Sequence, residues 1–289
     1  MTEKNKYKLS TEDHEMVFNG LLSEMLKRSG DPREHPRIVI LGGQPGSGKS
    51  KLTDIARETV FDNQPVAVIN GDDYRTFHPK AEEIFKNHDR QFAEMTDPDV
   101  RIWTPRLLGS AIQGRRNIVF EATMRNREPL MSTIDHLKEN GYMIDIMVMA
   151  VHESVSKAGI VKRYENQRAI GGIARWTPFE AHDEAYRNMP DTVGVIENQS
   201  HVDSVRVYNR AGELLYSNER KDGVFRQPLP WADAKAAVQK ERSRPFSVAE
   251  ERQLRENIKD IQKMMEDRGA GKDFGGIARR LFAPRGFEI

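Results

Sequence analysis

The chain has 289 residues, 37% of them hydrophobic, and no apolar run near the roughly 20 residues of a membrane span, which predicts a soluble protein with a full core. It contains no Cys, which excludes disulfides, thiol catalysis and Cys-ligated zinc. The 45 Lys and Arg residues against 44 Asp and Glu leave a net charge of +1, which gives no sign of a nucleic-acid or membrane surface.

Residues 1–35 are predicted to form a helical segment that packs on the rest of the chain. The first six residues are polar and show no secretory signal, so we expect a cytoplasmic protein. Ser10 begins a helix-capping sequence, and apolar residues then recur at helical spacing as far as Leu26. Gly30 and Pro32 end this helix before the first strand.

Short apolar runs alternate with helical stretches in the next part of the chain. The runs cover residues 38–41, 66–69, 117–120 and 144–151, and the clearest helices between them cover residues 49–59 and 129–140. Strands that alternate with helices are typical of a parallel sheet covered on both faces. We therefore predict an α/β fold with a parallel sheet flanked by helices.

Beyond the sheet the pattern becomes mainly helical. Helices predicted at 154–168 and 178–189 flank a Gly-Gly pair, and residues 154–190 form a candidate lid. A strand pair at 205–208 and 214–216, joined by a turn with Gly212, would complete a core of residues 36–222. Residues 223–289 are predicted as a helical C-terminal extension, with helices near 231–242 and 247–268 and a mobile tail.

The most specific motif follows the first predicted strand. Residues 43–50 fit the phosphate-binding pattern G-x-x-x-x-G-K-[ST], in which loop N–H groups and the start of a helix surround phosphate oxygens. Lys49 would contact the β- and γ-phosphates, and the Ser50 hydroxyl would bind Mg²⁺. The predicted nucleotide-binding residues are Gly43, Gln44, Pro45, Gly46, Ser47, Gly48, Lys49 and Ser50.

Two carboxylates follow the second predicted strand, beside the expected phosphate site. In an open α/β sheet, ligands bind beyond the carboxyl ends of the strands. Asp72 would take a proton from an acceptor hydroxyl as its oxygen attacks the γ-phosphorus. Asp73 is an alternative base or magnesium ligand, and with Arg75 it is also a candidate for acceptor binding. The competing interpretation is that Asn70-Gly71 forms an ordinary hairpin turn.

A second polar group follows the strand predicted at 117–120. Glu121 would hold a substrate hydroxyl or metal-bound water, and Thr123 and Arg125 would bind a polar or phosphorylated acceptor. An ordinary polar strand end is the alternative.

The candidate lid is rich in Arg. Any of Arg163, Arg168 and Arg175 would suit a position over a triphosphate, because a guanidinium binds phosphate oxygens in pairs. Each of them taken alone is more often a solvated surface residue. The histidines, including His78, His152 and His182, lack metal-site spacing and are interpreted as structural or supporting residues.

Taken together, these residues resemble the zeta toxin family, the kinase half of epsilon/zeta toxin–antitoxin systems, over about residues 36–218. A phosphate-binding loop alone recurs in many unrelated proteins, whereas this ordered series is selective. The motifs that carry the resemblance are Leu41 to Ser50, Asp72 with His78 and Pro79, Glu121 to Arg125, Val148 to Val151, Arg163 to Glu165, and Ala174 to Pro178 with Ala181 to Asp183.

The resemblance implies an ATP-dependent (or GTP-dependent) kinase that uses Mg²⁺ and phosphorylates the 3′-hydroxyl of the N-acetylglucosamine unit of UDP-N-acetylglucosamine. It implies that Lys49 and Ser50 bind phosphates and magnesium, and that Asp72 is the base. Arg163 and Arg175 would neutralise the transferred phosphoryl group, and Glu121 and Thr123 would belong to the sugar-nucleotide pocket. It also implies a small helical antitoxin partner that covers the ATP site.

Two other functions remain open from the residues alone. The acceptor of a kinase with this loop could instead be a nucleoside, a polynucleotide end, an antibiotic or a dinucleotide. A nucleotide-operated switch would need only the phosphate-binding loop, and it would not require the carboxylates and arginines that accompany the loop.

Overall fold

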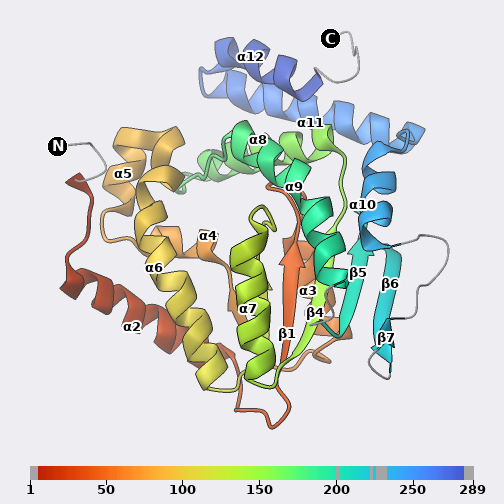
Figure 1. Ribbon diagram of the computed structural model, residues 1–289. Helices are drawn as coiled ribbons and strands as arrows, with labels where there is room; N and C mark the ends of the chain where they lie inside the picture. Colours follow the sequence, from red (N-terminus) through yellow and green to blue (C-terminus); the bar gives the residue numbers. More distant parts are fainter. Residues whose placement is uncertain (1–5, 199–201, 222–223, 226–232, 283–289) are drawn as a thin grey trace.

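A computed structural model describes residues 6–198, 202–221, 224–225 and 233–282, and it has a central sheet with helices on both faces (Figure 1). In the described residues the strand order is β2-β3-β1-β4-β5-β6-β7. The first five strands in that order pair in parallel, and β6 and β7 add an antiparallel edge, so the sheet is mixed rather than wholly parallel. The strands are β1 (Arg37–Gly42), β2 (Ala67–Ile69), β3 (Ile118–Glu121), β4 (Met143–Met149), β5 (Ser204–Tyr208), β6 (Leu214–Lys221) and β7 (Val224–Phe225).

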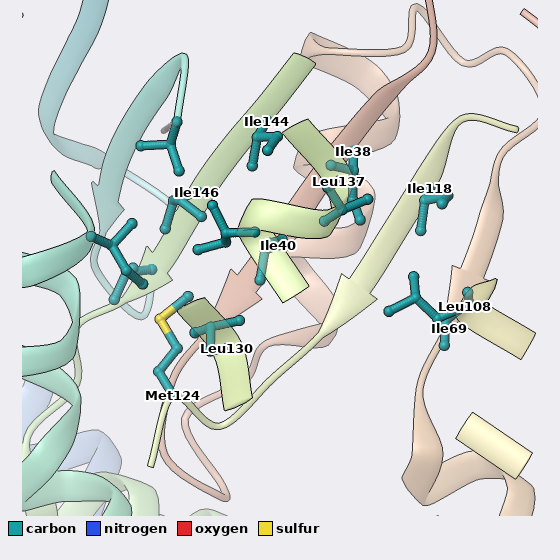
Figure 2. Packing of buried hydrophobic residues seen from close by; sticks show 14 of the residues in the cluster. Ile38, Ile40, Ile69, Leu108, Ile118, Met124, Leu130, Leu137, Ile144 and Ile146 are labelled. Carbon is teal, nitrogen blue, oxygen red and sulfur yellow. The ribbon is translucent and has the colours of Figure 1, made fainter. Parts of the chain in front are cut away.

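Alternate residues of the central strands face opposite helical layers. Ile38 and Ile40 of β1 belong to the large cluster that includes residues of α2 (Thr11–Arg28), α6 (Phe92–Gln113) and α7 (Arg127–Glu139). Figure 2 shows them beside Leu130 and Leu137 of α7. Val39 and Leu41 face the other way, toward α3 (Ser50–Thr59). Because both faces of β1 are buried, the sequence of this strand is a nearly continuous run of apolar residues.

Most of the elements predicted along the sheet are confirmed within one or two residues. The hairpin predicted around Gly212 is also confirmed, with φ +86° at that glycine. The hairpin interpretation of Asn70-Gly71 is wrong, because α4 (Gly71–Tyr74) starts there with the Asn70 side chain as its cap. No helix in the described part of the chain is long and apolar enough to cross a membrane.

The segment between β2 and β3 contains helices that the sequence patterns did not reveal. After α4 and η1 (Arg75–Phe77) come α5 (Ala81–His88), η2 (Asp89–Gln91) and α6. Helix α6 contains Pro98 and Pro105, residues that normally end a helix. Its buried residues, including Trp103, nevertheless pack into the main core, so tertiary contacts outweigh the local signal.

Helices α8 (Glu153–Ala169) and α9 (Phe179–Asn198) follow the carboxyl ends of the strands, and α8 lies beyond the arrowhead of β1 in Figure 1. Helix α9 continues past Pro190, well beyond the predicted end at residue 189. These helices form the roof over the end of the sheet where the polar residues gather.

The C-terminal helices belong to two different packing units. Helix α10 (Ala234–Ser243) joins the main core through Ala234, Ala237 and Val238, so this part of the predicted C-terminal extension packs back on the core. Helices α11 (Val248–Asp267) and α12 (Gly271–Phe282) instead form a second cluster with α8. Residues 271–282 are therefore helical rather than a mobile tail, and residues 283–289 lie outside the described residues.

Candidate active site

The predicted phosphate-binding loop connects β1 to α3 and has the conformation that its glycines permit. Gly46 and Gly48 have φ of +76° and +92°, in the left-handed region that favours glycine. The Lys49 ammonium lies on its own loop, where Nζ donates to the Gly43 carbonyl at 3.0 Å. Burial lowers the pKa of Lys49, and the carboxylates of Glu121 and Asp72 oppose this shift.

The side chain of Gln44 anchors the loop to the roof. Its Nε2 donates to the Val151 carbonyl at 2.9 Å and to Ser156 Oγ at 3.1 Å, and its Oε1 accepts from Arg242 Nη2 at 2.7 Å. Ser156 Oγ also lies 2.8 Å from His182 Nε2. Gln44, Ser156 and His182 are fully buried, so these bonds are protected from water.

The loop also touches α8 backbone to backbone. A Cβ added to Gly46 would lie 2.0 Å from the Ser156 carbonyl oxygen, and one added to Gly159 would lie 2.5 Å from the Gly46 carbonyl oxygen. Neither position has room for a methyl group. The loop and the first half of α8 therefore pack as one unit.

A cavity of about 780 Å³ opens beside the loop, and most of the predicted site residues line it. Lys49, Ser50, Asp72, Asp73 and Arg75 come from the loop and the β2–α4 region, and Glu121 and Thr123 come from the end of β3. Arg163 and Arg175 come from the roof. Residues that sequence analysis did not single out, among them Phe92, Thr104 and Ile173, complete the lining.

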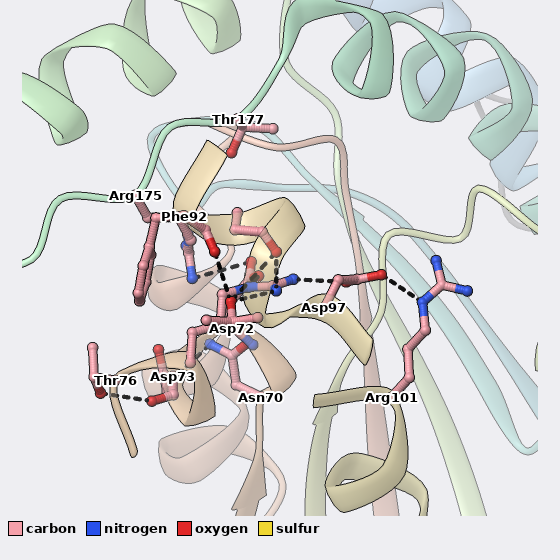
Figure 3. A network of polar contacts seen from close by, with 12 residues as sticks. Asn70, Asp72, Asp73, Thr76, Phe92, Asp97, Arg101, Arg175 and Thr177 are labelled. Atoms are coloured by element: carbon pink, nitrogen blue, oxygen red, sulfur yellow. Dashed lines mark hydrogen bonds and ion pairs between the residues drawn. The ribbon is translucent and has the colours of Figure 1, made fainter. Parts of the chain in front are cut away.

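Asp72 is the centre of a charged network in this cavity (Figure 3). Its Oδ1 accepts from Arg75 Nε at 3.0 Å, and its Oδ2 lies 3.2 Å from Arg175 Nη1. Burial raises the pKa of Asp72, but the positive charges of Arg175 and Arg75 outweigh it and lower the pKa to about 2. Asp72 is therefore an ionised carboxylate throughout the physiological pH range.

The pKa values of the two other carboxylates of the cavity shift in the opposite direction. Burial raises the pKa of Asp73, and the negative charge of Asp72 acts in the same direction. Burial likewise raises the pKa of Glu121, while the charge of Lys49 opposes it. Neighbouring carboxylates with different proton affinities are typical of catalytic sites.

Arg163 of α8 and Arg175, from the segment between α8 and α9, both line the cavity. Arg163 Nη2 donates to Thr177 Oγ1 at 3.0 Å, and burial together with Arg175 lowers the pKa of Arg163 to about 10. The Nε atoms of Arg163 and Arg175 are both buried without a hydrogen-bond partner. Two guanidinium groups that line a cavity with a glycine loop and a lysine form a site that fits phosphate oxygens.

Three predicted candidates have other surroundings. Arg75 also donates to the Ala93 carbonyl at 2.6 Å and pairs with Asp97 at 3.1 Å, so it mainly fixes Asp72 against α6. Arg125 lies outside the main cavity, 3.5 Å from Glu184. Arg168 pairs with Asp89, at a distance from the loop.

The histidines make structural contacts, as predicted. His152 caps α8 by accepting from the Ser154 N–H at 3.1 Å, and buried His78 accepts from the Lys80 N–H at 3.1 Å. No group of three metal-ligating side chains occurs among the described residues. A magnesium ion would therefore need phosphate oxygens in addition to the Ser50 hydroxyl, which lines the cavity together with Asp73 and Glu121.

A second cavity of about 610 Å³ adjoins the first, and both are lined by Gly159, Arg163, Gln167 and Arg210. Its floor includes Val155 of α8, and its far wall comes from the α10–α11 region. The rings of His152 and Phe246 pack there with centroids 4.6 Å apart. The polar residues Asn166, Gln253 and Asn257 also line this cavity.

Sequence analysis missed Arg210 and Gly159, which join the two cavities. Arg210 follows β5, and its Nη1 donates to the Gly46 carbonyl of the phosphate-binding loop. The rule that functional residues follow the carboxyl ends of strands could have found Arg210. Gly159 could have been noticed as a glycine inside a predicted helix, which often marks a close backbone approach.

Comparison with known proteins agrees with this arrangement. Residues 22–221 match the sequence profile of the zeta toxin family. The chain belongs to that family. Its curated relatives include Toxin zeta of Streptococcus pyogenes, 31% identical over 80% of this chain and 77% of the relative, and Toxin zeta of Enterococcus hirae, 30% identical over 87% and 85%.

Solved structures of low sequence identity share the fold of this zeta toxin family member. A chain from the PezAT chromosomal toxin–antitoxin system of Streptococcus pneumoniae superposes with a TM-score of 0.73 at 19% identity, covering 90% of this chain and 98% of that one. A chain of the AvrRxo1-ORF1:AvrRxo1-ORF2 complex gives 0.56 at 15% identity, covering 93% and 87%. The predicted α/β fold, with a sheet flanked by helices, is therefore confirmed.

Proposed function

We propose that this protein is the toxin of a toxin–antitoxin system and an ATP-dependent kinase that phosphorylates the 3′-hydroxyl of N-acetylglucosamine in UDP-N-acetylglucosamine. The observation that carries the kinase proposal is the cavity in which Asp72 and Glu121 face the phosphate-binding loop below Arg163 and Arg175. A loop that only held a nucleotide would not need this combination. The sugar-nucleotide acceptor is inferred from family membership.

In this reaction the acceptor hydroxyl oxygen forms a bond to the γ-phosphorus, and the bond from that phosphorus to the β-phosphate oxygen breaks. The hydroxyl proton passes to the Asp72 carboxylate, and ADP leaves. Catalysis in such reactions comes mainly from positioning and charge neutralisation. Lys49 would exchange its bond to the Gly43 carbonyl for phosphate oxygens, while Arg163 and Arg175 hold the transferred group.

Triphosphate binding would also change the state of Asp72. In the structure Arg175 pairs with Asp72 at 3.2 Å. Phosphate oxygens would compete for that guanidinium, because bidentate arginine–phosphate bonds are strong. Losing part of this pairing raises the proton affinity of Asp72, so the carboxylate becomes a better base once the donor is in place.

Magnesium would be held by the Ser50 hydroxyl and the phosphate oxygens, with Asp73 bound directly or through water. When bound, it supplies positive charge to the β- and γ-phosphate oxygens. The nucleoside half of the donor would enter the second cavity past Gly159 and Arg210. The His152–Phe246 pair offers an aromatic surface for the base, and Asn257 and Gln253 offer amides for its polar edge.

The biological setting is also a proposal. We propose that the protein acts in the cytoplasm, where it would be held inactive by a small helical antitoxin that covers the ATP site. Two structural relatives come from a toxin–antitoxin system and from a two-component complex, which supports a partner of this kind.

The test is acceptor profiling with γ-labelled ATP and Mg²⁺ against UDP-N-acetylglucosamine, UDP-glucose, nucleosides, dinucleotides, oligonucleotides and aminoglycosides. We expect label in UDP-N-acetylglucosamine, with a Lys49→Ala variant as the inactive control. Labelling of another acceptor in place of the UDP-sugar would overturn the substrate assignment. ATP hydrolysis with no labelled acceptor in the panel would favour a nucleotide-operated switch.

A further inference from the structure

The guanidinium of Arg242 reaches the phosphate-binding loop from the C-terminal part of the chain. Arg242 lies in the last turn of α10, and 198 residues separate it from Gln44. Its Nη2 donates to Gln44 Oε1 at 2.7 Å, and its Nη1 donates to the Tyr186 carbonyl at 2.6 Å. The Tyr186 ring also stacks on the guanidinium, 4.1 Å from centroid to Cζ.

This cation is buried, and no carboxylate of the described residues forms an ion pair with it. Arg242 is 5% exposed, and its Nε has no hydrogen-bond partner. Burial lowers the pKa of Arg242 to about 10. A buried, unpaired charge is costly to maintain. Such a residue calls for an explanation other than stability.

Gln44 connects the buried Arg242 side chain to the phosphate-binding loop. With Nε2 bound to Val151 and Ser156 and Oε1 bound to Arg242, the Gln44 carboxamide is held from three directions. Gln44 is also the residue after Gly43, whose carbonyl holds Lys49. The orientation of Gln44 therefore fixes the backbone of the loop at its first turn.

Helix α10, which carries Arg242, is held in place by contacts along its length. Ala234, Ala237 and Val238 are buried in the main core, and the Ala234 N–H donates to Glu197 of α9 at 2.8 Å. Just beyond the other end of the helix, Arg244 pairs with both Glu241 and Glu250, and these ion pairs link α10 to α11. The guanidinium thus projects from a fixed support onto the loop.

We propose that Arg242 is a positioning residue of the donor site, which holds Gln44 and thereby keeps the phosphate-binding loop in the conformation that accepts a triphosphate. This inference rests on the proposed function, because it assigns α10 a role in donor binding. Arg242 acts through Gln44 and does not contact the acceptor. Its removal therefore affects donor affinity and leaves acceptor affinity unchanged.

The test measures ATP binding by calorimetry without acceptor, and then the KM of each substrate, in Arg242→Met. We expect about tenfold weaker ATP binding, the scale of one charge-assisted hydrogen bond, with an unchanged acceptor KM. Lys240→Met is the matched control, since exposed Lys240 lies two residues earlier on the same helix. Thermal unfolding of each variant shows whether it is folded.

A double-mutant cycle with Gln44→Ala shows whether Arg242 acts through that side chain. The double variant should bind ATP no more weakly than Gln44→Ala alone. If Arg242→Met does not fold, Arg242→Lys replaces it in the cycle and should keep part of the affinity. Equal ATP affinity of the parent and the variant, additive effects in the cycle, or equal losses of donor and acceptor affinity would overturn the inference. A parent protein that fails to bind ATP would instead refute the proposed function.

Discussion

The phosphate-binding loop is tied to neighbouring elements through the Gln44 side chain, whereas the acceptor side of the cavity carries carboxylates whose pKa values are raised by burial. On the first side, Gln44 uses both carboxamide atoms and Gly46 contacts α8 directly. On the second side, Thr104 Oγ1 is buried without a hydrogen bond, and burial raises the pKa of Glu121. The backbone of the donor loop is therefore held in place before any ligand arrives.

The largest expected effect concerns Asp72, which lies between the two sides. We expect Asp72→Asn to lower kcat by about 10³-fold, in the range of lost general-base catalysis. ATP should bind at least as tightly as in the parent, because the substitution frees Arg175 and Arg75 from a carboxylate. Single-turnover kinetics and ATP calorimetry measure the two quantities. A kcat within about tenfold of the parent value would remove Asp72 as the base.

The pH dependence distinguishes Asp72 from Asp73 as the proton acceptor. A base must be ionised, and the lowered pKa of Asp72, about 2, keeps it ionised as the pH falls. With Asp72 as base, kcat/KM for ATP, which reports groups of the ligand-free enzyme, should show no loss from an enzyme carboxylate between about pH 8 and pH 5. Burial raises the pKa of Asp73, so an acidic limb in this range that disappears in Asp73→Asn would assign the role to Asp73.

The acceptor side is tested by Glu121→Gln. The substitution keeps the size of the side chain and removes its charge, so it should raise the acceptor KM about tenfold, the scale of a charged hydrogen bond. The KM for ATP should stay within about twofold of the parent value. Glu139→Gln, at an exposed position of α7, is the control. A change confined to the KM for ATP would place Glu121 on the donor side.

The smallest effect is expected at the outer end of the donor site. We expect Phe246→Ala to raise the KM for ATP about threefold, because it removes an aromatic surface beside the proposed base position. The acceptor KM should not change. Val248→Ala, at an exposed position nearby, is the control. An unchanged KM for ATP in a folded Phe246→Ala variant would place the base elsewhere.

Local sequence patterns could predict the donor loop because its chemistry is contained in eight consecutive residues. The strand before Gly43 and the helix after Lys49 both have clear periodicity, and their arrangement is confirmed. Strand ends were equally informative, since Asp72 and Glu121 line one cavity although 49 positions separate them. Arg210 satisfies the same rule, and it was missed because β5 belongs to a strand pair interpreted only as the edge of the core.

The acceptor wall and the C-terminal contacts could not be predicted in this way. Pro98 and Pro105 interrupt the helical signal of α6, and only packing of residues such as Trp103 against the core explains the helix. The bond between Arg242 and Gln44 has no local pattern at all, because it depends on where α10 packs. Contacts of this kind are decided by tertiary structure.

The close contact between Gly46 and Gly159 limits how the site can admit its substrates. Because the two backbones touch, the first half of α8 cannot rise from the loop without breaking the anchor formed by Gln44 and Ser156. Substrates must therefore enter the cavity by a path that leaves the first half of α8 in contact with the loop.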